Sequence, residues 1–209
     1  MRVMFIEPPK DFWFLMGEYL PPPLGILQLA AYLERENPDV EIEVVDCQAE
    51  SLDWRDLEQR IESFDPDIVA SSGLATCNTY AAVRTLAAAK KLKPHVLTVA
   101  GGQHFTATAQ ESLREYPEID VIVRGEGEGT LAELVQSLSE GKSFSRVRGI
   151  SFRSNGEIVE TSNRPLIENL DDLPFPGYHF VKEVIHKYHF TMMAGPDITY
   201  LIIEGSRGC

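Results

Sequence analysis

Residues 67–104 read DIVASSGLATCNTYAAVRTLAAAKKLKPHVLTVAGGQH and predict one complete unit of strand, helix and strand. The runs 67–71 and 96–100 are short, rich in β-branched residues and almost continuously apolar, whereas the run 79–92 between them is amphipathic. Strands that are continuously apolar are buried on both faces, as in a parallel sheet with helices on either side. The stretch therefore predicts a parallel α/β fold.

The same alternation continues on both sides of this stretch. Further strands are predicted at 2–6, 43–46 and 120–123, and further helices at 24–36, 54–64, 106–116 and 129–140. In the first and last of these helices, apolar residues recur every three to four positions, which gives each helix one buried stripe. Five successive units of strand and helix predict a doubly wound, five-stranded parallel sheet.

The pattern changes after Gly141. Alternating runs at 149–153 and 157–161 flank Ser154-Asn155-Gly156, and Asn-Gly between such runs is a strong signal for a β-hairpin. The segment 163–178 contains LDDLPFPGY and has no clean period, so an extended linker is predicted there. A short helix near 179–188 and a strand at 198–203 follow. We expect a domain at 1–142, a hairpin and linker at 143–178, and the start of a further domain at 179–209.

Composition and charge restrict the classes of function. The chain is 44% hydrophobic and 24% charged, which is ordinary for a soluble globular protein. Its net charge of −13 offers no attraction to nucleic acid or to anionic lipid. The N-terminus lacks the pattern of a signal peptide, and no stretch approaches the roughly 18 apolar residues of a membrane helix. We expect a cytoplasmic protein with no nucleic-acid or membrane partner.

The cysteines Cys47, Cys77 and Cys209 are odd in number and widely spaced. This pattern argues against a framework of disulfides and against a self-contained zinc site. Cys47 and Cys77 are expected to be buried or free thiols, as is usual for cysteines in cores. Cys209 is the last residue of the sequence.

Glycine-rich segments follow three of the predicted strands, at 71–74, 101–104 and 124–129. In open parallel sheets, ligands bind at the carboxyl ends of the strands. Glycines let the backbone approach a ligand closely, and the helices that follow offer free N–H groups to an anion. The composition of this edge predicts a ligand that carries a phosphate.

Two common phosphate sites do not match these segments. A dinucleotide fingerprint would lie between the first strand and its helix, where the loop 7–23 contains a single glycine. The GEGEG at 125–129 lacks the GK[ST] ending of a nucleoside triphosphatase. A catalytic or metal cluster of His104, Glu126 and Glu128 remains open, although the two glutamates also suit the N-terminus of the next helix.

Two of the segments together resemble those of cobalamin-binding domains. Ser72-Gly73-Leu74 and Gly101-Gly102 match the S-x-L and G-G elements of these domains with their usual separation. PPPLGILQLAAYLE at 21–34, GGQHFTA at 101–107, GEGE at 125–128, LDDLPFP at 170–176 and SRGC at 206–209 follow in order. In this order they resemble the N-terminal half of cobalamin-dependent radical S-adenosylmethionine enzymes. Within these enzymes, the sequence resembles the branch that is similar to radical methyltransferases and the anaerobic magnesium-protoporphyrin ester cyclase.

The resemblance implies a Rossmann-like cobalamin-binding domain and specific site residues. Ser72, Leu74 and Thr76 would line the slot for the nucleotide tail, and Gly101 and Gly102 would give it room. The cofactor-binding residues that it implies are Leu24, Ser72, Leu74, Thr76, Gly101, Gly102, His104, Gly125, Glu126 and Gly127. It implies no catalytic residue in this chain.

The resemblance also implies further cofactors in a longer protein. Cys209 would be the first ligand of a [4Fe–4S] cluster that binds S-adenosylmethionine, and residues 179–209 would begin the radical S-adenosylmethionine barrel. The second and third cluster cysteines are missing, and a cluster needs several thiolates. We therefore expect a truncated chain that is inactive alone and has cobalamin and the rest of the barrel as partners. The full-length parent would catalyse methyl transfer or cyclase-type oxidative chemistry.

One departure from the best-known cobalamin domains concerns the cobalt ligand. Their D-x-H-x-x-G motif, whose histidine binds cobalt, is missing from this sequence. The loop 7–23 stands in its place and offers the apolar run 12–16, which we expect to cover the lower face of the corrin. We expect cobalt to be bound without a protein histidine. The alternatives are a binding module of the same fold that no longer takes a corrin and an unrelated flavodoxin-like enzyme.

Overall fold

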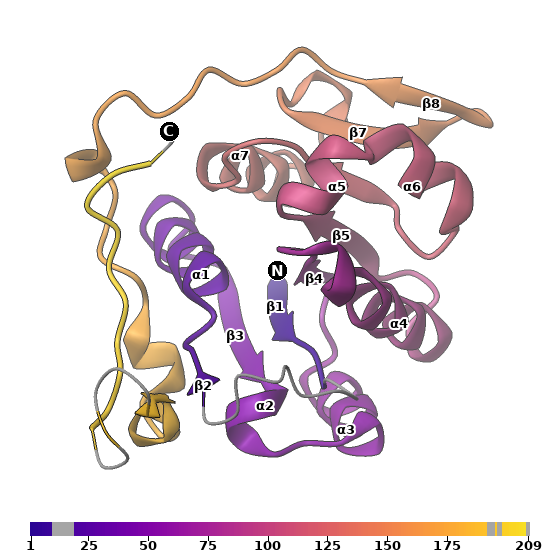
Figure 1. Cartoon of the computed structure of the whole chain (residues 1–209). Helices are drawn as coiled ribbons and strands as arrows, with labels where there is room; N and C mark the ends of the chain where they lie inside the picture. The colour runs from indigo at the N-terminus through magenta and orange to yellow at the C-terminus, as the bar shows by residue number, and fades with distance from the viewer. Residues whose placement is uncertain (10–18, 192–194, 196–197, 208–209) are drawn as a thin grey trace.

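The computed structural model describes residues 1–9, 19–191, 195 and 198–207. Figure 1 shows a central sheet between helices and a C-terminal extension along one side. Within the described residues the main sheet has seven strands in the order β3-β1-β4-β5-β6-β7-β8. They are β1 (Arg2–Glu7), β3 (Glu41–Asp46), β4 (Ile68–Ser72), β5 (Leu97–Gly101), β6 (Val121–Val123), β7 (Ile150–Ser154) and β8 (Glu157–Glu160). A separate antiparallel pair joins β2 (Tyr19–Leu20) to β9 (His189–Phe190).

The strands β3, β1, β4, β5 and β6 are parallel and are connected by helices. The helices are α1 (Leu24–Glu36), α2 (Cys47–Glu50), α3 (Trp54–Phe64), α4 (Thr76–Leu92), α5 (Gln103–Ala107), α6 (Ala109–Glu115) and α7 (Glu128–Ser139). The chain passes from β1 outward to β3 and then crosses to β4, so the strand order reverses between β1 and β4. This confirms the predicted doubly wound α/β fold.

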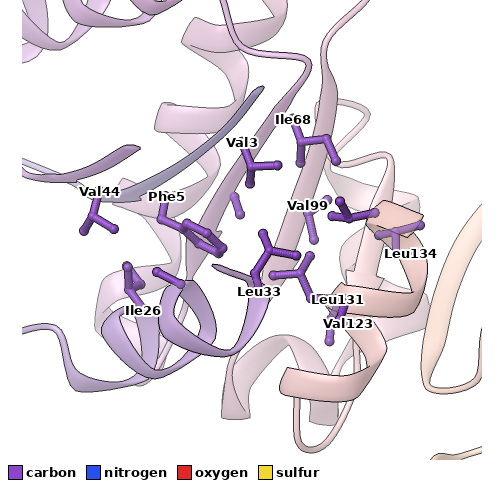
Figure 2. Packing of buried hydrophobic residues seen from close by; sticks show 14 of the residues in the cluster. Val3, Phe5, Ile26, Leu33, Val44, Ile68, Val99, Val123, Leu131 and Leu134 are labelled. Atoms are coloured by element: carbon purple, nitrogen blue, oxygen red, sulfur yellow. The ribbon is translucent and has the colours of Figure 1, made fainter. Parts of the chain in front are cut away.

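The strand β1 shows why the sheet is covered on both faces. Its residues 3–6 are almost fully buried, and because side chains alternate along a strand they enter two different cores. Val3 and Phe5 pack into the cluster that contains residues of α1 and α7, and Figure 2 shows this packing. Met4 and Ile6 pack into the cluster that contains residues of α3 and α4. The continuous apolar run of the sequence therefore reflects burial on both faces, as predicted.

The predicted β-hairpin is confirmed, and it extends the main sheet. Asn155 and Gly156 both have positive φ, at 52° and 82°, as a two-residue turn between twisted strands requires. The strand β7 pairs antiparallel with β6 as well as with β8. The described sheet thus consists of the five predicted parallel strands and two antiparallel strands.

Three local predictions were wrong. The helix predicted at 106–116 is divided into α5 and α6 by Thr108, whose backbone is not helical (ψ 29°) and whose hydroxyl bonds the His104 carbonyl. The helix predicted near 179–188 consists of the 3₁₀-helices Tyr178–Val181 and Ile185–Lys187. The described residues 198–207 contain no strand. The segment 179–188 makes tighter local turns, as in the bond from the Lys187 N–H to the Val184 carbonyl oxygen. In 198–207 the N–H groups of Tyr200 and Ile202 instead find partners in another segment.

The described residues after β8, which we call the extension (residues 161–207), are docked on the first domain. They do not form a free linker. Gln28 Nε2 donates to the Pro174 carbonyl oxygen (2.8 Å), and the Gly177 N–H donates to the Leu27 carbonyl oxygen (3.0 Å). Tyr188 is fully buried, and its hydroxyl donates to Asp46 Oδ2 (2.9 Å). Within the described residues, no helix combines the length and the apolar character needed to cross a membrane.

Asp46 connects the end of β3 to this extension. Its Oδ1 accepts the N–H groups of Gln48 and Ala49, and its Oδ2 accepts the Tyr188 hydroxyl. Burial raises the pKa of the Asp46 carboxyl to about 6, and the hydrogen bond from Ala49 opposes this rise. The negative charge of Glu7 on the adjacent β1 raises the pKa further.

We expect stability to depend on pH through Asp46. Its folded-state pKa of about 6 lies above its unfolded value, so the folded state binds the proton more tightly. This contribution is complete below about pH 4 and is lost as the pH rises through about 6. Asp46→Asn keeps an acceptor for the helix cap. Relative to the wild type, this variant should gain about 2.5 kcal/mol of unfolding free energy between pH 4 and pH 7.5. Urea unfolding at both pH values measures this, and parallel pH profiles would contradict it.

Candidate functional site

The carboxyl ends of the parallel strands form the edge at which the candidate site lies. Ligands of open α/β sheets bind at this edge, beside the reversal of strand order. Across the reversal between β1 and β4, Ser71 Oγ donates to the Ile6 carbonyl oxygen (3.0 Å). The next residue, Ser72, ends β4 and pairs with Gly101, which ends β5. The predicted site residues Ser72 and Gly101 are therefore neighbours.

The loops that follow β4 and β5 are held together by their backbones. The Gly73 N–H donates to the Gly101 carbonyl oxygen (2.9 Å), and the His104 N–H donates to the Gly73 carbonyl oxygen (3.1 Å). Gly102 has φ 92° and ψ 177°, a conformation that is essentially restricted to glycine. A Cβ atom on Gly102 would lie 2.8 Å from Ser72 Oγ and 2.9 Å from the Gly73 carbonyl oxygen. We call residues 72–73 and 101–102 the double loop.

Exposed apolar side chains lie in the segment that follows the first half of the double loop. Leu74 is 66% exposed and Tyr80, near the start of α4, is 75% exposed. Thr76 is the first residue of α4, and its Oγ1 lies 3.3 Å from His104 Nδ1. Apolar surface with a few polar groups at fixed positions is characteristic of sites for large organic ligands.

The helices at this edge differ in how their N-termini are capped. The side chains of Asp46 and Asp53 cap α2 and α3. The helices α4 and α7, whose N-cap residues are Ala75 and Gly127, have no side-chain cap. N–H groups in the first turn of an uncapped helix can bind an acceptor, and the helix dipole favours an anion there. Thr79 on α4 also buries an Oγ1 that has no hydrogen-bond partner within the described residues.

The GEGE loop (residues 125–128) follows β6 at the same edge. The Gly125 N–H donates to Thr106 Oγ1 (3.1 Å), which ties the loop to α5. Gly127 approaches α1 closely, since a Cβ atom on it would lie 3.0 Å from a side-chain atom of Leu29. Glu126 Oε2 accepts the N–H of Ile167 in the extension (2.5 Å). This glutamate therefore binds the extension.

The hypothesis of a metal cluster at His104, Glu126 and Glu128 was wrong. His104 faces Thr76, whereas Glu128 Oε1 binds Arg207 Nη2 at 2.6 Å. Among the residues that the structure describes, no three His, Cys, Asp or Glu side chains could hold a metal ion. The three groups diverge because the glutamates point toward the extension and the histidine points toward α4.

The other predicted positions lie at the margin of the site or outside the described residues. Leu24 is the half-buried first residue of α1. Cys47 is buried and Cys77 is exposed, and both are free thiols. Cys209 and the apolar run 12–16 lie outside the described residues.

Sequence reasoning missed several residues at this edge. Thr79 and Tyr80 follow Thr76 by three and four positions on α4, and helical spacing alone could have suggested them. Gly73 was noted only as part of a motif, yet a Cβ atom there would lie 2.8 Å from the Phe105 ring. Arg207 contacts the GEGE loop, but the sequence carries no signal for these contacts, because at least 78 residues lie between Arg207 and each partner.

Comparison with protein families finds a match to the B12 binding domain over residues 17–135, more than half of the chain. The uncharacterized methyltransferase PH0819 of Pyrococcus horikoshii is 34% identical over an alignment of 211 residues that covers 100% of this chain and 43% of that protein. The anaerobic magnesium-protoporphyrin IX monomethyl ester cyclase of Rubrivivax gelatinosus is 35% identical over 177 residues, 82% of this chain and 31% of the cyclase. The chain spans less than half the length of these relatives.

Solved structures with the same fold include two radical enzymes. OxsB, with aqua-cobalamin and S-adenosylmethionine bound, superposes with a TM-score of 0.69 at 18% identity, over 88% of this chain and 25% of that chain. TsrM from Kitasatospora setae, with cobalamin and a [4Fe–4S] cluster bound, has a TM-score of 0.63 at 22% identity, over 83% of this chain and 30% of that chain. At these identities the superpositions show a shared fold.

Proposed function

This chain belongs to the B12-binding domain family, and we propose that it binds cobalamin at the carboxyl ends of β4 and β5 as the corrin-binding part of a radical S-adenosylmethionine enzyme. The double loop is the observation that carries the proposal. Its backbone contacts leave no room for a Cβ atom on Gly102, whereas a Cβ atom on Gly101 would meet nothing closer than 3.7 Å. Gly101 therefore leaves space at the edge where a ligand could approach the backbone.

The groups beside the double loop fit the chemistry of cobalamin. Cobalamin combines a broad apolar ring, amide side chains around the ring and a nucleotide tail with a phosphate. Leu74, which the resemblance assigns to the slot for the tail, is proposed here to contact the ring instead, because Leu74 and Tyr80 both offer exposed apolar surface. Ser72 and Thr76 offer hydroxyl groups, and the uncapped N-terminus of α4 offers N–H groups for polar parts of the tail.

The other predicted cofactor residues take supporting places in this proposal. Gly125 is tied to α5 by its bond to Thr106, and Gly127 allows the GEGE loop to approach α1. His104 bonds Thr76 and lies edge-on to Phe105. We propose that this imidazole positions α4 and does not bind cobalt. Leu24 and Glu126 are proposed as contacts at the margin of the site.

The activity of the longer protein is also a proposal. The relatives are named as methyltransferases and as a magnesium-protoporphyrin ester cyclase. We propose that residues 1–142 hold the corrin and that residues 143–178 connect them to a second domain. Residues 179–209 would begin this second domain, a barrel that binds S-adenosylmethionine and a [4Fe–4S] cluster. Cys209 would be one ligand of the cluster. Bound cobalamin would supply a methyl group or a radical partner. The chain's own residues would bind and orient it. We keep the cytoplasm as the proposed location.

Reconstitution with hydroxocobalamin tests the proposal directly. The purified chain is mixed with the corrin, desalted and reduced, and its visible and electron paramagnetic resonance spectra are recorded. We expect retained corrin with a base-off spectrum and no nitrogen splitting on the axial lines. A folded but colourless protein would favour the module without a corrin. Nitrogen splitting would show an axial nitrogen ligand, either the corrin's own base or a histidine, and would contradict base-off binding without a histidine.

A further inference from the structure

The last described residues of the extension bring Arg207 into a group of three carboxylates. Its Nη2 lies 2.6 Å from Glu128 Oε1, and its Nε donates to Glu204 Oε2 (2.5 Å). Its Nη1 lies 3.7 Å from Glu126 Oε1. Figure 1 shows that the last described part of the chain, in yellow, runs back toward α7. We call these four side chains the Arg207 cluster.

The centre of the Arg207 cluster is largely removed from water, whereas the side chain of Glu204 at its margin is 40% exposed. The Glu128 residue is only 4% exposed, and the side chain of Arg207 is 20% exposed. Burial opposes the charge of the guanidinium, but hydrogen bonds to Glu128 and Glu204 outweigh it, so the pKa of Arg207 is raised. One guanidinium faces three carboxylates here, so the cluster keeps a net negative charge and Arg207 supplies its positive charge. Removing it would leave a buried carboxylate without its cation, which is far more costly than losing a surface pair.

Apart from Arg207, the segment 198–207 is attached through Tyr200 and Ile202. The side chains of Ile198, Leu201 and Ile203 are between 46% and 69% exposed, so burial of apolar surface contributes little. The Tyr200 N–H donates to the Tyr188 carbonyl oxygen (2.8 Å). The Ile202 N–H donates to the Tyr178 hydroxyl (2.9 Å), which in turn donates to the Ile202 carbonyl oxygen (2.6 Å). The Tyr200 ring also packs against the rings of Tyr19 and Phe190.

We propose that Arg207 is a positioning residue whose charge anchors the segment 198–207 to the GEGE loop at the N-terminus of α7. Glu126 strengthens the anchor, because its other oxygen accepts the Ile167 N–H and so holds an earlier part of the extension to the same loop. This anchor would hold Arg207 itself beside the ligand-binding edge. That consequence rests on the proposed function, whereas the anchor itself does not.

Amide hydrogen exchange of the apo-protein tests the anchor without any cofactor. The amides of Tyr200 and Ile202 report on the segment, and amides of β4 and β5 report on the fold. Arg207→Met should speed exchange at the two reporter amides by about tenfold or more, with no change in the sheet. Arg148→Met, at an exposed position, is the matched control and should change neither.

Two further variants separate charge from packing. Arg207→Lys should restore part of the protection, because it keeps the positive charge but loses the fork that reaches several carboxylates. The double variant Glu128→Gln, Arg207→Met should lose less protection from exchange than the sum of the losses in the two single variants, since each single change removes the same ion pair. Unchanged exchange in Arg207→Met, or equal losses in the Met and Lys variants, would overturn the proposal. Corrin retention, measured separately, tests only the proposed function.

Discussion

Leu74→Asp should abolish the retention of cobalamin while the protein stays folded. In the proposed complex the corrin covers this side chain, which is 66% exposed in the structure. The change removes about 1–2 kcal/mol of apolar contact and places a carboxylate beneath an apolar ring, where its desolvation costs more. We expect affinity to fall by about 100-fold or more, which corresponds to roughly 3 kcal/mol. Titration of hydroxocobalamin, followed by visible absorption, measures this loss.

Leu166→Asp is the matched control for this prediction. Leu166 is 72% exposed, so the two leucines are alike in exposure, but Leu166 lies in the extension and not beside the double loop. Both variants should unfold within about 0.5 kcal/mol of the wild type, because exposed positions tolerate substitution. Only Leu74→Asp should lose the corrin. Equal affinity in the two variants would contradict the placement of the ring at Leu74.

Gly102→Ala should produce the largest loss of stability of any small substitution at the site. An alanine would have to adopt φ 92°, which costs about 1–3 kcal/mol. Its Cβ atom would also lie 2.9 Å from the Gly73 carbonyl oxygen, a backbone atom that cannot rotate away. Overpacking of this kind adds about 1–3 kcal/mol. We expect the free energy of unfolding to fall by about 3–5 kcal/mol in urea titrations.

Gly101→Ala tests whether position or residue type causes this effect. A Cβ atom there would meet only atoms of Val123, at 3.7 Å or more, which is ordinary van der Waals contact. Alanine also has lower conformational entropy than glycine in the unfolded chain. We expect unfolding free energy to change by less than about 1 kcal/mol. A loss as large as that of Gly102→Ala would show that the double loop is not held as described.

The local sequence was sufficient to predict a feature where a single physical constraint acts on neighbouring residues. A short, continuous apolar run that is rich in β-branched residues, such as residues 3–6, favours a strand buried on both faces, and the structure places this run so. Asn155 and Gly156 predicted their turn because both must adopt positive φ. Ser72 and Gly101 were predicted to meet because the carboxyl ends of parallel strands lie at one edge.

Predictions failed where the partner of a residue is distant in the sequence. The run 198–203 has the composition of a strand, yet its Tyr200 N–H bonds the carbonyl of Tyr188 and no strand forms among the described residues. Glu126 and His104 lie in loops that follow adjacent strands, and this placement favoured the hypothesis of a shared metal site. The extension binds Glu126 and α4 binds His104, and neither contact has a local signal.

The sequence by itself determined the parallel α/β fold, the turn of the hairpin and the glycines of the double loop, because each depends on hydrophobic periodicity or on the φ angle of a single residue. Only the tertiary structure decided that the extension folds back over the domain, that Asp46 is buried under Tyr188, and that Arg207 enters a group of three carboxylates. These features depend on the balance between desolvation and pairing of distant charges, and that balance exists only after the chain has folded.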